Sequence, residues 1–128
     1  MALGPEEYNL VKYIRNRLDV SVVECNSWKE ISKLVSDSGI VVGNDGAFVH
    51  LAVWKGIPSV MICGPLSPIV NGIWRYGIGQ TIFVPKHCIC NNLWQGKCNY
   101  NHYCLNQITV TDAVQAIGEL EIYLNERT

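Results

Sequence analysis

Asp45 and His50 are the side chains of this chain best placed to do chemistry. They lie five residues apart, and Asp45 is followed directly by Gly46 and Ala47. A carboxylate accepts hydrogen bonds and an imidazole can donate one. The pair can therefore bind the polar groups of a small ligand.

The segments around this pair predict a site for an anion. Residues 39–42 are apolar, as in a buried strand, residues 44–46 favour a turn, and residues 47–55 can form a helix. The first N–H groups of a helix lack partners within it and lie at the positive end of its dipole, so such a junction binds phosphate well. We therefore predict a phosphate site built from Asp45, Gly46, Ala47 and His50.

Each of these residues also has a purely structural interpretation. Asp45 could cap the helix, Gly46 could serve the turn with a positive φ, and His50 could be a hydrogen-bonded core histidine. A close approach of the Gly46 backbone to phosphate would instead be functional. The spacing from Asp45 instead places His50 a little over one turn into the helix. It would then be near enough to reach a bound diphosphate, and we favour this interpretation.

These residues need a sheet and helices to hold them, and the hydrophobic pattern predicts both in alternation. Strands that alternate with helices argue for a parallel sheet covered on both faces, so we predict a Rossmann-like α/β fold. Ligands bind such sheets beyond the carboxyl ends of the strands, where Asp45, Gly64 and the loop at Ser67 would lie. Strands are expected at residues 21–23, 40–42, 58–63 and 81–84, and helices at 5–18, 27–39, 47–55 and 113–124.

Local patterns refine these elements. Ser27 and Glu30 have the spacing of a capping box at the start of the second helix, and Gly56 is placed to end the third. Residues 64–80, rich in glycine and proline, are expected to form the longest irregular segment. Apolar faces are predicted for the second helix from Trp28, Ile31, Leu34 and Val35, and for the last helix from Ala113, Val114, Ile117, Leu120 and Leu124.

Composition limits the class of protein. The 128 residues leave room for one domain, and 10 basic against 11 acidic residues without a basic run argue against a nucleic-acid partner. No apolar stretch reaches the length of about 20 residues that spans a bilayer, and we expect a cytoplasmic setting.

Four segments, in their order and spacing, resemble the donor-binding core of glycosyltransferase family 9, the ADP-heptose:lipopolysaccharide heptosyltransferases and their relatives. They are Asn-Asp-Gly-Ala at 44–47, His-Leu-Ala at 50–52, Gly-Ile-Pro at 56–58 and Gly-Pro-Leu-Ser-Pro at 64–68. Residues 4–7 and 88–110 resemble further family motifs, so the resemblance covers nearly the whole chain. One departure is that Gly46 and Ala47 stand where the family usually has Ser or Thr and then Gly.

This resemblance implies the C-terminal lobe of a GT-B enzyme that transfers a sugar, a heptose, from a nucleotide-diphosphate donor to a lipopolysaccharide-type acceptor with inversion. Asp45, Gly46, Ala47 and His50 would hold the diphosphate, Glu6 or Glu7 would bind the ribose, and Asn26 would lie near the base. Glu6 and Glu7 could equally be ordinary acidic residues in the first turn of a helix.

The resemblance also implies what this lobe lacks. It implies no cofactor or metal, and no catalytic residue, since relatives carry the base on a preceding lobe that binds the acceptor. We expect this chain alone to bind the donor without transferring the sugar. The surface facing the other lobe could then support a homo-oligomer. The full-length protein would lie at the cytoplasmic side of the inner membrane.

The cysteines allow several interpretations. Cys25 and Cys63 have apolar neighbours and are expected to be buried. Zinc, disulfides and reduced thiols all remain open for the remaining cluster, although its spacing lacks the paired C-x2-C of strong zinc signatures. The cluster consists of Cys88, Cys90, Cys98 and Cys104, with His87 and His102 among them.

Two other classes of protein remain open. One is a non-enzymatic nucleotide-binding or regulatory domain. The other is a zinc-stabilised interaction module built around Cys88 to Cys104.

Overall fold

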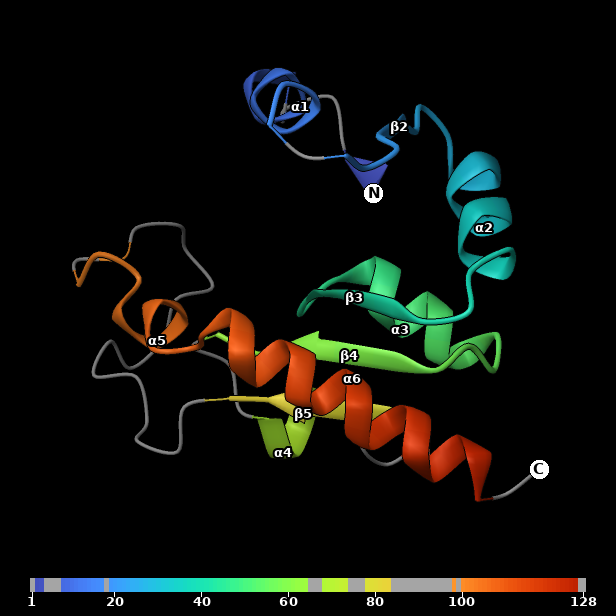
Figure 1. The fold of residues 1–128 in the computed structure, drawn as a ribbon, viewed down its shortest axis with the longest axis vertical. Helices are drawn as coiled ribbons and strands as arrows, with labels where there is room; N and C mark the ends of the chain where they lie inside the picture. Colours follow the sequence, from blue (N-terminus) through green and yellow to red (C-terminus); the bar gives the residue numbers. More distant parts are fainter. Residues whose placement is uncertain are drawn as a thin grey trace. The chain divides into compact units, whose positions relative to one another are not determined.

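A computed structural model of the chain describes residues 2–3, 8–17, 19–64, 68–73, 78–83, 98 and 100–126. The chain divides into two compact units, Met1–Asp37 and Ser38–Thr128. Figure 1 shows the helices and strands of both units, labelled except for β1. No helix in these ranges combines the length and the apolar character needed to cross a bilayer.

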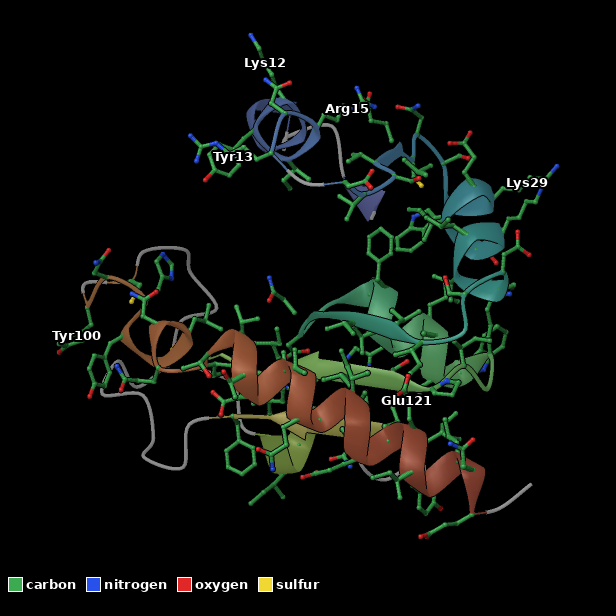
Figure 2. All side chains as sticks on the ribbon, in the orientation of Figure 1. Lys12, Tyr13, Arg15, Lys29, Tyr100 and Glu121 are labelled. Carbon is green, nitrogen blue, oxygen red and sulfur yellow. The ribbon has the colours of Figure 1, made fainter. Side chains whose placement is uncertain are left out.

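The first unit is a parallel strand pair with two helices. It contains β1 (Ala2–Leu3), α1 (Tyr8–Arg15), β2 (Val23–Glu24) and α2 (Trp28–Ser36). β1 and β2 run parallel, with Ala2 opposite Val23. Tyr13 and Arg15 project from α1 (Figure 2), and Arg15 Nη2 lies 3.2 Å from Glu24 Oε1 of β2. The predicted strand at 21–23 is therefore displaced toward the carboxyl end, because Val23 and Glu24 are the residues that pair with β1.

The start of α2 confirms half of the predicted capping box. Ser27 Oγ accepts a hydrogen bond from the Glu30 N–H at 3.3 Å. The Glu30 carboxylate accepts from the Asn26 N–H at 2.9 Å, so the reciprocal bond reaches one residue further back than predicted. Val35 is buried as expected, but Trp28 is 64% exposed, so the predicted apolar stripe is wrong at the first residue of the helix.

The second unit contains a three-stranded parallel sheet in the order β3-β4-β5. Its strands are β3 (Val41–Asn44), β4 (Ser59–Ile62) and β5 (Gly79–Ile82). Val42 lies opposite Val60, and Val60 lies opposite Gln80. The helices of this unit are α3 (Ala47–Trp54), α4 (Pro68–Asn71), α5 (Tyr103–Asn106) and α6 (Val110–Asn125).

Helices cover both faces of this sheet. Successive residues of a strand point to opposite faces. α3 packs on β3 and β4, whereas α6 packs on β4 and β5, and Figure 1 shows α6 lying across the front of these two strands. One core cluster consists of Val49, Val53, Met61, Cys63 and Ile73, and the other of Val60, Ala116 and Leu120. Because Met61 and Val60 are neighbours in β4, the two clusters lie on opposite faces. The predicted α/β architecture with a parallel sheet between helices is confirmed.

Some predicted boundaries are wrong. Residues 64–80 are not irregular throughout, because they include α4 and the first two residues of β5. β5 begins at Gly79 rather than Thr81, since its pairing with β4 starts where Gly79 lies opposite Ser59. In α6 the predicted Val114 is 62% exposed and lies off the packed face, whereas Leu120 is 2% exposed.

The ends of the long helices follow local rules. Gly56, with φ of 78°, follows α3, as predicted. Thr109 and Asp112 form a full capping box at the start of α6, with Asp112 Oδ2 accepting from the Thr109 N–H at 2.6 Å. The hydrogen bonds from Thr109 lower the pKa of the Asp112 carboxyl.

Replacing Gly79 by Ala should destabilise the protein, because an added Cβ would lie 2.7 Å from the Ile73 carbonyl oxygen. Overpacking of this kind typically costs about 1–3 kcal/mol. Gly118→Ala in α6 is the matched control, since outside its own helix nothing lies within 4 Å of that Cβ. There alanine should stabilise by about 1 kcal/mol relative to glycine. Urea denaturation should give changes of opposite sign, and a Gly79→Ala variant as stable as the wild type would contradict the packing.

Candidate functional site

The β-sheet holds Asp45 in place at the carboxyl end of β3. The Asp45 N–H donates to the Ile62 carbonyl at 3.0 Å, so the pairing of β3 with β4 continues one residue past the strand. The Asp45 side chain is only 15% exposed. Its carboxylate is therefore largely removed from water, in a position that the backbone pairing fixes.

Gly46 is the N-cap of α3, and two sequence-based interpretations of this turn are wrong. Among the described residues no side chain caps the helix, so Asp45 does not act as the cap. Gly46 has φ of −169° and ψ of 173°, which is extended backbone and not the positive φ that favours glycine. A Cβ at Gly46 would lie 3.7 Å from the Asn44 carbonyl oxygen, an ordinary contact. Glycine suits the N-cap position in this conformation, and close approach of a ligand to its backbone stays a prediction.

His50 lies next to Asp45, as the spacing predicts. His50 Nε2 is 3.3 Å from Asp45 Oδ1, and the His50 side chain is 43% exposed. An ionised carboxylate can only accept a hydrogen bond, so Nε2 must carry the proton that it donates. The pair therefore joins a largely buried acceptor to a ring that ligands can reach.

Close packing of α3 on β3 keeps this geometry. Val49, directly before His50, is fully buried. A Cβ added at Gly43 would lie 2.9 Å from Val49 Cγ2, closer than real Cβ contacts allow. Glycine at this position therefore lets the first turn of α3 lie against β3, which brings His50 to Asp45.

The second carboxylate oxygen of Asp45 is unsatisfied among the described residues. Asp45 Oδ2 is buried and has no hydrogen-bond partner there. A buried acceptor without a partner costs on the order of 1–3 kcal/mol. The site thus has capacity for one further donor.

Cys63, directly after β4, is a third titratable group at this edge of the sheet. Its side chain is fully buried, and its N–H donates to the Ile82 carbonyl at 2.8 Å. Burial first, then the charges of Asp45 and of Cys104, raises the pKa of the Cys63 thiol to about 11. The thiol is therefore protonated at neutral pH and is a poor nucleophile.

Helix α5 lies against the same edge. A Cβ at Gly64 would lie 3.4 Å from Leu105 Cδ2, so α5 packs on the residues that follow β4. Cys104 is buried beside Leu105. Tyr100 and Tyr103, at the start of α5, are exposed, and Figure 2 shows Tyr100 beside this helix. The sequence did not predict that α5 packs against the end of β4. The apolar neighbours of Cys63 in the sequence did correctly predict that this residue is buried.

The other predicted site residues lie in different parts of the chain. Ala47 is the exposed first residue of α3. Glu6, Glu7 and the loop at Ser67 lie outside the described residues. Asn26 belongs to the first unit, where it is exposed and its N–H is bonded to Glu30.

The cysteine cluster is described only in part. Cys88, Cys90 and His87 lie outside the described residues. Cys98 and Cys104 are free cysteines, and Cys98 Sγ accepts a hydrogen bond from the His102 N–H at 3.2 Å. Within the described ranges no group of three or more histidine, cysteine or acidic side chains could hold a metal ion.

Comparison of the chain with protein-family models, with curated proteins and with solved structures finds no match in any of the three.

The raised pKa of Cys63 predicts a loss of stability in alkali. The ordinary thiol pKa is 9.0 and the folded value is about 11. A group that holds its proton more tightly when folded stabilises the fold fully below the unfolded pKa, and this contribution disappears as pH rises through the folded pKa. The unfolding free energy of the wild type, relative to Cys63→Ala, should therefore fall between about pH 9 and pH 11.

Urea denaturation under reducing conditions from pH 7 to pH 11 measures this difference, with Cys98→Ala at a partly exposed thiol as the control. The stability gap between wild type and Cys98→Ala should change less over the same range. A gap between wild type and Cys63→Ala that is independent of pH would show that the thiol is not held protonated by the fold.

Proposed function

We propose that this chain is the donor-binding lobe of a glycosyltransferase of the GT-B type, similar to family 9. The observation that carries the proposal is the Asp45–His50 pair at 3.3 Å, placed between the carboxyl end of β3 and the start of α3. Parallel α/β sheets bind ligands at this end of their strands.

The proposed ligand is the diphosphate of a nucleotide sugar. Among the described residues no side chain caps α3, so we expect its first N–H groups to bind phosphate oxygens. His50, when protonated, adds a charged donor close to them. Together they would offset the negative charge that develops on the diphosphate as the glycosidic bond breaks.

The sequence resemblance supplies the finer part of the proposal. It implies that the sugar is a heptose and that the acceptor is of the lipopolysaccharide type, bound by another lobe at the cytoplasmic side of the inner membrane. The residues of this chain would bind and orient the donor. Proximity and orientation are worth about 7–11 kcal/mol in favourable cases, so transfer requires both partners in one cleft.

ADP is the probe that tests the phosphate site directly. Thermal shift and calorimetry should show that ADP binds more tightly than AMP, because AMP lacks the second phosphate. His50→Ala should weaken ADP binding by about 1–3 kcal/mol, as expected for the loss of a charged hydrogen bond. His102→Ala, at an exposed histidine in the turn before α5, should leave the affinity unchanged. Equal ADP affinity of His50→Ala and wild type, with intact circular dichroism, would refute the proposed site.

Gly46→Val tests whether the backbone approaches the ligand closely. Its extended φ of −169° suits valine, so the stability cost is limited to the poorer N-cap. That cost should be about 1 kcal/mol or less. ADP binding should be lost if the ligand contacts the Gly46 backbone, because the branched side chain would occupy that space. Parallel chemical denaturation and ADP titration separate the two effects, and undiminished ADP binding would place the phosphates elsewhere.

A further inference from the structure

We propose that Asp45 is a positioning residue that acts through His50: it fixes the proton on His50 Nε2 and leaves Nδ1 as the ring atom that meets the ligand. The role of Nδ1 toward a diphosphate rests on the proposed function, but the positioning itself does not.

The contact between the two side chains defines the protonated nitrogen. Asp45 Oδ1 lies 3.3 Å from His50 Nε2, and a carboxylate can only accept. Asp45 cannot easily turn away, because its side chain is 15% exposed and its N–H is bonded to Ile62. Neutral His50 therefore carries its proton on Nε2.

The negative charge of Asp45 argues against a direct phosphate contact. This charge contributes to the raised pKa of the Cys63 thiol, so it acts on its immediate surroundings. A phosphate brought to the same carboxylate would be repelled, because like charges in a poorly hydrated site interact strongly. A protonated His50 between the carboxylate and the ligand would replace this repulsion with attraction.

The free ring atom can serve two kinds of partner. Within the described residues, the hydrogen bond of the His50 ring is made through Nε2, while the side chain stays 43% exposed. Neutral Nδ1 accepts a hydrogen bond from a ligand hydroxyl, whereas protonated Nδ1 donates to a phosphate oxygen.

Nitrogen-15 NMR of the chain without nucleotide tests the positioning. Wild type should show neutral His50 protonated on Nε2, with an Nε2-bound proton protected from exchange with water. Asp45→Ala should lose this protection and populate both tautomers. Asp45→Asn should retain the Nε2 proton, because an amide oxygen also accepts. A wild type protonated on Nδ1, or an Asp45→Ala variant with unchanged His50 signals, would overturn the proposal.

A double-mutant cycle on ADP affinity tests whether Asp45 acts through His50. We expect Asp45→Ala and His50→Ala each to weaken ADP binding about tenfold or more. The double variant should bind ADP no less tightly than whichever single variant has the lower ADP affinity. Independent, multiplicative losses would show that Asp45 contacts the ligand itself and would overturn the proposal. If wild type does not bind ADP, the proposed function fails, and the NMR signals alone then decide the positioning.

Discussion

The candidate site depends on how closely α3 packs against β3 at Gly43. A side chain there would collide with Val49, whose Cγ2 atom would lie 2.9 Å from the new Cβ. Gly43 lies two residues before Asp45, and Val49 lies directly before His50. Any residue larger than glycine at position 43 would require Val49 or the first turn of α3 to shift, next to the residues that carry the carboxylate and the imidazole.

The charges at this edge of the sheet are arranged around Asp45. Its carboxylate lies just before the start of α3, where the helix dipole favours a negative charge, and His50 offers it a hydrogen bond. Cys63 experiences the same charge, and together with burial this keeps its thiol protonated. The Cys63 thiol therefore stays neutral beside this carboxylate, whereas His50 contacts the carboxylate directly.

The sequence predicts those features that depend on neighbours along the chain. The alternation of helices and strands, the end of α3 at Gly56 and the approach of His50 to Asp45 all follow from local spacing. Strand ends are less predictable, because they depend on pairing with another strand, as at Gly79 opposite Ser59. The approach of α5 to Gly64 could not be predicted, since it joins segments far apart in the chain. The exposure of Val114 likewise reflects which side of α6 meets the sheet.

The position of each strand in the described sheet determines how exposed the residue that follows it is. β4 lies between two strands, so the residue that follows it, Cys63, is fully buried and its thiol is poorly reactive. β3 pairs with β4 on one side only, and the residue that follows it, Asp45, is 15% exposed. The helix that starts there carries a histidine that is 43% exposed. At the end of β3, pairing with β4 thus holds the backbone of Asp45 in place. The Asp45 carboxylate, itself largely buried, contacts solvent-exposed His50.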